Sequence, residues 1–283
     1  MALPGSAQMF CGGAYCIYNK KTMAVLGFVL PHAPGTFLQG YLAGMLVLFD
    51  FDGTLADTLP RVLRLWPRLA RELRLNDPGP EGLQALRSRP LAEVLAALKV
   101  PWWKVPPLLW RGRTLLHGDP EPIAFFPGMA DLLCSLDSLG VEWGILTTNG
   151  LVLVRRALRE NGVPEPGLLE AGLGLSGKRE RLRHLAQQQE IALSQVVLVA
   201  DEPRDAEAAQ AAGVGFLGVA WGYATAQALR ASGGGRIVET PEELLEALME
   251  GRYVLDGAVA EEELRPGFLS RLARRFAWLP DLF

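Results

Sequence analysis

The chain has 283 residues, a length that fits one large domain or one domain with a smaller companion. Its 31 acidic side chains outnumber the 28 basic ones, and a net charge of −3 argues against a general attraction to nucleic acid or anionic lipid. No stretch approaches the roughly 20 apolar residues that cross a bilayer, and three cysteines cannot form a disulfide framework for so long a chain. We therefore expect a soluble, cytoplasmic protein with neither nucleic-acid nor membrane partners.

Residues 1–44 differ in composition from the rest, because they contain no Asp, Glu or Arg and hold both Cys11 and Cys16. We treat them as an atypical N-terminal extension. Three interpretations are open: an appended leader or over-extended start, a targeting segment built on Lys20 and Lys21, and a segment that binds a partner or covers a substrate.

From residue 45 onward, short apolar β-rich runs alternate with longer helical stretches, which is typical of a parallel sheet covered by helices. We predict strands at 45–49, 141–147, 196–200 and 216–220. Helices are predicted at 130–139, 152–161, 179–189, 205–212 and 241–249, the last with Thr240 as its N-cap. The pattern indicates a doubly wound α/β core, in which a ligand lies beyond the carboxyl ends of the strands.

The region 62–122 interrupts this alternation and predicts a small helical insertion after the first strand. It shows leucine-rich helical periodicity at 61–75 and 91–98, followed by a run of prolines and tryptophans at 101–107. The core would then consist of residues 45–61 and 123–250. The remaining tail, 251–283, is expected to hold an amphipathic helix at 266–278.

An acidic motif, DFDGTLAD, follows the first predicted strand at residues 50–57. Two carboxylates directly after a buried strand are costly unless they are paired, hydrogen-bonded or bound to a metal. In extended backbone, the spacing of Asp50 and Asp52 turns both carboxyl groups to the same side, and Gly53 allows a sharp turn that exposes N–H groups. The pattern therefore predicts an anion or metal site where this strand ends.

This motif resembles the first motif of the haloacid dehalogenase superfamily of phosphotransfer enzymes, hhhhDxDGTLxD. Three further motifs follow in the family's order: a hydrophobic strand followed by Thr148 and Asn149, a lysine at a helix start (Lys178), and an acidic motif at 196–205 that contains Asp201. One position departs from the pattern. Where the family has a glycine before the last acid, this chain has Ala200, which would be strained if the backbone required a positive φ there.

The resemblance implies a fold and a reaction. The fold is a doubly wound parallel-sheet core with the helical insertion as a cap. The reaction is hydrolysis of a small phosphorylated metabolite through an aspartyl-phosphate, as in the phosphoglycolate phosphatase branch, with Mg²⁺ as cofactor. Two alternatives stay open: a phosphomutase of the same superfamily, and a non-catalytic binding module that keeps the fold.

The resemblance also implies roles for individual residues. Asp50 would be the nucleophile, and Asp52 would act first as acid and then as base. The side chains of Asp50 and Asp201 and the backbone carbonyl of Asp52 would hold Mg²⁺, while Lys178 would neutralise charge beside the phosphoryl group. Four more residues complete the implied site, two that hold the phosphate and two that support the metal from outside: Thr148, Asn149, Glu202 and Asp205.

Several conspicuous residues outside the motifs are expected to be structural. Trp102 and Trp103 stand between prolines and are interpreted as packing residues, and His117 and His184 stand alone in helical contexts. Cys134 lies among leucines and is predicted to be a small buried side chain.

Overall fold

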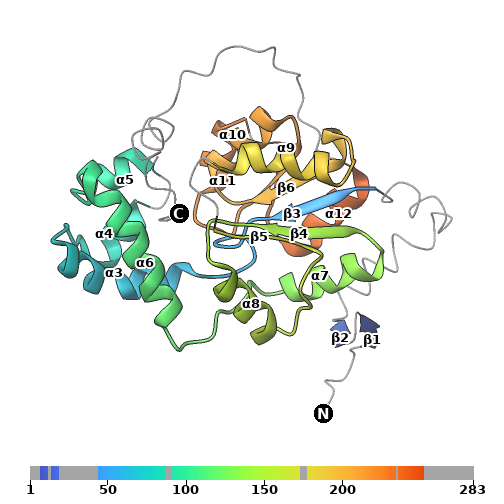
Figure 1. Cartoon of the computed structure of the whole chain (residues 1–283), viewed down its shortest axis with the longest axis horizontal. Helices are drawn as coiled ribbons and strands as arrows, with labels where there is room; N and C mark the ends of the chain where they lie inside the picture. The colour runs from blue at the N-terminus through green and yellow to red at the C-terminus, as the bar shows by residue number, and fades with distance from the viewer. Residues whose placement is uncertain are drawn as a thin grey trace.

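A computed structural model describes residues 7–11, 14–18, 44–86, 89, 91–172, 177–233 and 235–251. Its main sheet contains six strands: β3 (Leu46–Phe49), β4 (Glu142–Leu146), β5 (Leu168–Glu170), β6 (Val196–Ala200), β7 (Gly215–Val219) and β8 (Arg236–Val238). They are all parallel, in the order β5-β4-β3-β6-β7-β8 (Figure 1). The first strand of this sheet, β3, lies in its middle, and the later strands are added on both sides of it. This arrangement confirms the predicted doubly wound α/β core.

Helices cover both faces of this sheet. One face packs against α7 (Met129–Ser138), α8 (Leu151–Glu160) and α12 (Pro241–Glu250), the other against α9 (Lys178–Gln188), α10 (Pro203–Ala212) and α11 (Ala226–Ala231). The central strand shows why: Val47 and Phe49 join the first apolar cluster, whereas Leu46 and Leu48 join the second. Because successive strand residues point to opposite faces, a strand between two helix layers must be apolar throughout.

The predicted strands and helices of the core are found with slightly different ends. The N-cap of α12 is also confirmed, since the Thr240 hydroxyl accepts a hydrogen bond from the N–H of Glu243 at 3.2 Å. Sequence analysis missed β5 and β8, which have three residues each and lie at the two edges of the sheet. Strands of three residues are too short to show an alternation of apolar and polar side chains, so only their pairing with a neighbouring strand defines them.

Between β3 and α7 the chain forms a helical insertion, the name we use for residues 59–118. It comprises α3 (Leu59–Leu73), α4 (Gly79–Ala85), α5 (Leu91–Ala97), the 3₁₀ turn η1 (Trp102–Lys104) and α6 (Val105–Gly118). These helices have an apolar cluster of their own, which includes Trp66, Leu98 and Leu115, and they stand beside the sheet rather than on it (Figure 1). The division of the chain into core, cap and tail stays a prediction.

The sequence analysis gave no bounds for α6: it described 101–107 only as a run of prolines and tryptophans within the helical insertion, although it placed His117 in a helical context. Pro106 and Pro107 lie in its first turn, where backbone N–H groups have no helical partner, so prolines are tolerated there.

Two short strands precede the main sheet. The strands β1 (Ala7–Cys11) and β2 (Ala14–Tyr18) form an antiparallel pair that the sequence analysis did not predict. The helix expected at 266–278 lies outside the described residues. Among the helices of the described part of the chain, none is long and apolar enough to cross a membrane.

Candidate active site

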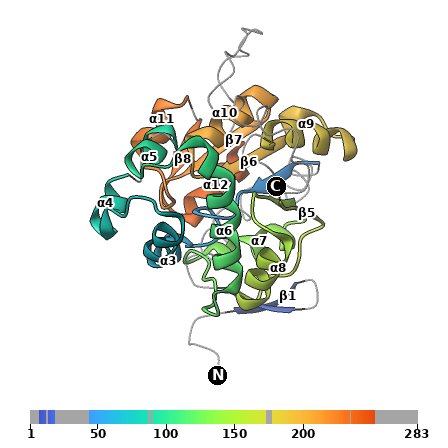
Figure 2. The ribbon, with the colours of Figure 1, turned by 60° about the vertical axis from the view of Figure 1, so that its left-hand side comes forward.

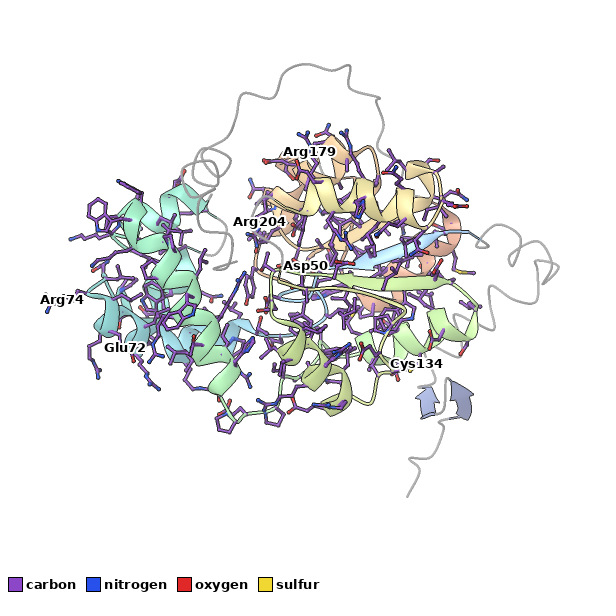
Figure 3. All side chains as sticks on the ribbon, in the orientation of Figure 1. Asp50, Glu72, Arg74, Cys134, Arg179 and Arg204 are labelled. Atoms are coloured by element: carbon purple, nitrogen blue, oxygen red, sulfur yellow. The ribbon has the colours of Figure 1, made fainter. Side chains whose placement is uncertain are left out.

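The site lies where the strand order reverses, between β3 and β6. These neighbours are paired with Phe49 opposite Val199, and the N–H of Asp50 donates to the carbonyl of Val199 at 2.9 Å. Asp50 and Asp201, which follow the two strands directly, therefore emerge side by side at the carboxyl edge of the sheet. Figure 3 shows Asp50 at the end of the sheet nearest the helical insertion.

A buried lysine connects two of the predicted acids. The Nζ atom of Lys178, the first residue of α9, lies 2.7 Å from Oδ2 of Asp50 and 2.8 Å from Oδ1 of Asp205. The other oxygen of Asp50 accepts the N–H of Phe51 at 2.7 Å. All three charged side chains are buried, so each needs the others as partners.

Asp52 is held apart from this lysine by a different set of partners. Its Oδ1 accepts the hydroxyl of Thr58 at 2.7 Å, and its Oδ2 accepts the side-chain amide of Asn149. The Thr58 oxygen is in turn 2.7 Å from the hydroxyl of Tyr223. Asp52 is only partly buried, in contrast to Asp50 and Asp201.

Asp201 is fully buried and enclosed by backbone. Its carboxylate accepts the hydroxyl of Thr54 at 3.0 Å and the N–H of Tyr223 at 2.6 Å. A Cβ atom at Gly53 would lie 2.2 Å from Oδ2 of Asp201, and one at Gly222 would lie 2.4 Å from the same oxygen. The loop after β3 thus touches Asp201 directly. Only glycine at positions 53 and 222 leaves room for the Asp201 carboxylate.

The second predicted phosphate-binding element is the loop after β4. Thr147 is buried and its hydroxyl accepts the N–H of Asn149 at 3.1 Å, so this residue shapes the loop. Thr148 is half-exposed, as a residue that meets a ligand must be. Helix α8 begins immediately afterwards at Leu151, and the positive end of its dipole favours an anion at this loop.

Burial dominates the electrostatics of the site. It raises the pKa of Asp50 to about 7 even though Lys178 opposes the shift, and it raises the pKa of Asp52 against its hydrogen bonds to Thr58 and Asn149. Burial together with the charges of Glu202 and Asp50 raises the pKa of Asp201 well above its ordinary value. For Lys178 burial lowers the pKa, but the carboxylates of Asp205 and Asp50 outweigh it and raise the pKa overall.

These shifts reflect an excess of negative charge. Five carboxyl groups and two cations act on one another here: Asp50, Asp52, Asp201, Glu202, Asp205, Lys178 and Arg204. Arg204 is bound to Glu202 at 2.7 Å, so the pair adds no net charge. The remaining acids outnumber Lys178, and a bound cation would relieve their mutual repulsion.

The residues present fit a hard divalent cation. Asp50 and Asp201 supply oxygen ligands at adjacent strand ends, and Oδ2 of Asp205 is buried without a hydrogen-bond partner among the described residues. In the part of the chain that the structure describes, no three His, Cys, Asp or Glu side chains form a metal site by themselves. A cation here would therefore also need backbone carbonyl or water ligands.

The structure brings Lys178 into contact with Asp50 and Asp205, brings Asn149 into contact with Asp52, and adds other residues. Thr54, Thr58, Arg204 and Tyr223 contact the acids but were not assigned a role from the sequence. For Thr54, Thr58 and Arg204 the available signal was their position inside or just after the motifs, whereas Tyr223 lies in the loop after β7. Ala200 causes no strain, because it lies in β6 and is not among the residues with positive φ.

Comparisons with known proteins agree with this geometry. A family model described as haloacid dehalogenase-like hydrolase matches residues 47–219. The chain is 32% identical over 205 residues to a phosphoglycolate phosphatase of Synechococcus elongatus, a match that covers 72% of this chain and 97% of that protein. It is 28% identical to hexitol phosphatase A of Escherichia coli, with 61% and 81% covered. A crystal structure of a predicted phosphatase from Clostridium acetobutylicum has a TM-score of 0.63 at 19% identity, covering 73% of this chain and 98% of that one.

The fold and the site define a doubly wound α/β enzyme with its acids at the switch point of the sheet. The matched range identifies the family: the chain belongs to the haloacid dehalogenase-like hydrolases. Within that family it is a hydrolase of the phosphatase type. The resemblance inferred from four ordered motifs is thereby confirmed.

Proposed function

We propose that this phosphatase is Mg²⁺-dependent and hydrolyses a small phosphorylated metabolite of the phosphoglycolate type. The observation that carries the proposal is the contact of Lys178 with both Asp50 and Asp205, beside Asp201, at the carboxyl edge of the sheet. A nucleophilic carboxylate, a cation to neutralise the phosphoryl oxygens and a second pair of acids for a metal are then within one site. The similarity to the phosphoglycolate phosphatase of Synechococcus elongatus supports this substrate class.

In the first half-reaction, an oxygen of Asp50 attacks phosphorus and forms the aspartyl-phosphate, while the bond between phosphorus and the alcohol oxygen breaks. Asp52 gives its proton to the departing alkoxide, a role that its raised pKa suits. In the second half-reaction, Asp52 takes a proton from water, the water oxygen attacks phosphorus, and the bond to Asp50 breaks. Inorganic phosphate leaves, and both aspartates return to their starting states.

The other residues hold the reacting groups. Lys178 would stay charged beside Asp50 and pair with the phosphoryl oxygens, and the Thr148 hydroxyl and Asn149 N–H would hold the phosphate from the loop after β4. Asp50, Asp201 and the Asp52 carbonyl would hold Mg²⁺, which supplies charge stabilisation for the transferring phosphoryl group. The helical insertion would act as a cap that excludes water and supplies substrate contacts.

The test is turnover of an aryl phosphate by the full chain, with and without Mg²⁺. We expect Mg²⁺-dependent hydrolysis that Asp50→Asn abolishes, whereas Glu207→Gln, an exposed carboxylate on α10, serves as the matched control and retains it. Hydrolysis that persists without divalent metal, or in Asp50→Asn, would contradict the proposal. Phosphate transfer to a sugar instead of water, followed with a labelled donor, would identify a phosphomutase.

A further inference from the structure

The helical insertion differs sharply in charge from the rest of the chain. Residues 59–118 contain eleven Arg and Lys side chains against four Asp and Glu, a net charge of +7, whereas the remaining residues together carry −10. The net charge of −3 hides this separation, and the expectation of no membrane partner rested on that sum. A basic module on an acidic protein fits an anionic partner through charge complementarity.

The basic side chains of the insertion fall into two groups. Five arginines have carboxylate partners: Arg61, Arg64, Arg68, Arg89 and Arg111. In contrast, the side chains of Arg71, Arg74 and Lys99 are exposed and form no ion pair or hydrogen bond within the described part of the chain. No acid of the protein therefore neutralises these three charges at the surface.

The exposed cations gather where α3, α5 and η1 meet. Lys104 of η1 donates through Nζ to carbonyl oxygens at the end of α3, including that of Arg74 at 3.4 Å. The N–H of Asn76 donates at 3.0 Å to the carbonyl oxygen of Leu98, the residue before Lys99. Figure 2 shows α3, α4 and α5 together on one side of α6, and Figure 3 shows Arg74 at the outer edge of the insertion. The cations thus share one outward-facing end.

Two tryptophans are exposed at the same end. Trp102 and Trp103 directly precede Lys104 in η1 and are 42% and 59% exposed, so neither is the buried packing residue that the sequence suggested. An indole combines an apolar body with a polar N–H, which suits the boundary between lipid headgroups and acyl chains. We call this set of exposed residues the basic tip: Arg71, Arg74, Lys99, Trp102 and Trp103.

The geometry of the basic tip favours a lipid surface over nucleic acid. Single-stranded nucleic acids stack successive bases on aromatic faces. The rings of Trp102 and Trp103 pack edge to face, with centroids 5.7 Å apart and planes at 89°, so they provide no pair of parallel platforms. Cations and indoles at an outer edge can instead meet an anionic membrane together, the cations at the headgroups and the indoles just beneath them.

We propose that the basic tip binds the surface of membranes that contain anionic phospholipids. The site acids lie at the edge of the sheet, and the basic tip contains none of the residues proposed to bind or hydrolyse substrate. Membrane binding and phosphatase activity would then be separate properties of the chain.

Co-sedimentation of the full chain with vesicles provides the test. We expect binding to vesicles of phosphatidylglycerol and phosphatidylcholine in equal parts, weaker binding as salt is added, and no binding to phosphatidylcholine alone. The double variant Arg74→Gln/Lys99→Gln should weaken binding roughly 20- to 30-fold, because each cation near an anionic surface contributes a factor of about 5. Trp103→Ser should weaken binding without changing its salt dependence. Arg230→Gln, an exposed arginine of α11, is the matched control and should bind normally.

Three outcomes would overturn the inference: no binding to the mixed vesicles, equal binding to both kinds of vesicle, or undiminished binding by the double variant. The last result would assign membrane binding to another part of the chain. Tighter binding to a single-stranded oligonucleotide than to vesicles would indicate a nucleic-acid partner instead. Hydrolysis of an aryl phosphate in solution should be equal in all these variants, which checks their folding and keeps this test separate from that of the proposed function.

Discussion

Gly222 shows how little space surrounds the buried carboxylate of Asp201. A Cβ atom here would lie 2.2 Å from the Cβ of Asp201 and 2.3 Å from the carbonyl oxygen of Gly53. Neither atom can rotate away, since one is the root of its side chain and the other is backbone. The overlap can be relieved only by a backbone shift that moves the loop of Gly222 away from Asp201 and Gly53.

We therefore expect Gly222→Ala to abolish turnover and to lower the free energy of unfolding by about 1–3 kcal/mol, as overpacking does. Urea denaturation and aryl phosphate hydrolysis measure the two effects. Gly167→Ala is the matched control, because a Cβ at Gly167 meets no atom within 4 Å. Normal turnover in Gly222→Ala would show that the site tolerates displacement.

Tyr223 influences the acid through Thr58. A threonine hydroxyl has one hydrogen, so when Thr58 donates to ionised Asp52 its oxygen accepts from Tyr223. The hydrogen bond from Thr58 lowers the pKa of Asp52 against the effect of burial. Tyr223 supports that bond by holding Thr58 in place.

In Tyr223→Phe, we expect the pKa of Asp52 to rise further. The proposed mechanism needs protonated Asp52 in the first half-reaction, so the basic limb of the kcat/KM profile against pH would move to higher pH. Thr58→Val should shift the limb in the same direction. An unchanged profile in both variants would exclude this chain of hydroxyl groups from control of the acid.

At the scale of elements, the two connections between the sheet and the helical insertion are tied together by arginines. Arg61, in the first turn of α3, lies 3.3 Å from Asp119 in the returning connection, and both side chains are buried. From the core, Arg156 of α8 donates to the carbonyl oxygens of Asp119 and Pro120, each at 2.9 Å. The insertion is thus attached through a buried ion pair as well as through its two chain crossings.

Arg61→Met should lower the free energy of unfolding by about 2–4 kcal/mol, because it leaves the buried Asp119 with a more exposed partner. Arg68→Met is the control: it removes an exposed pair with Glu72, which is worth well under about 1 kcal/mol. Urea unfolding measures both. Equal losses in the two variants would mean that burial of the Arg61 pair is irrelevant to stability.

The elements that could be predicted are those with a strong local pattern. The strand at 46–49 is apolar throughout because helices cover both of its faces. The acidic motif at 50–57 follows it directly in the chain, so both the strand and the motif could be predicted from the local sequence. In contrast, α6 begins at a proline-rich segment, where local preference indicates a turn and packing against α3 determines the outcome. His117 was interpreted as a structural residue for the same reason: its neighbour Gly150 is brought to it by the orientation of α6.

At the scale of the whole molecule, the acidic site links stability to pH and, through the proposed cation, to metal. The pKa of Asp50, raised to about 7, exceeds its ordinary value of 3.8, so between these values the folded state holds more protons than the unfolded state. The contribution of this group to stability therefore falls as pH rises through that window. A cation that replaces the protons would restore it.

We expect Mg²⁺ to raise the Tm of the full chain, and more at pH 8 than at pH 5, where protons compete for the carboxylates. Asp201→Asn should remove most of this increase. Thermal unfolding, with NaCl added to match ionic strength, provides the measurement. A Mg²⁺-induced increase of the same size in Asp201→Asn would place the cation elsewhere.

The amino-acid sequence by itself determined the fold class, the order of the motifs and the types of group that perform the chemistry, since these depend on local patterns of apolar, acidic and glycine residues. Only the tertiary structure decided which distant residues meet. Tyr223 reaches Thr58 across 165 positions, and Lys178 lies between Asp50 and Asp205 because β3 ends, and α9 and α10 begin, at one edge of the sheet. Such contacts follow from how helices pack on strands, and local preferences do not encode that packing.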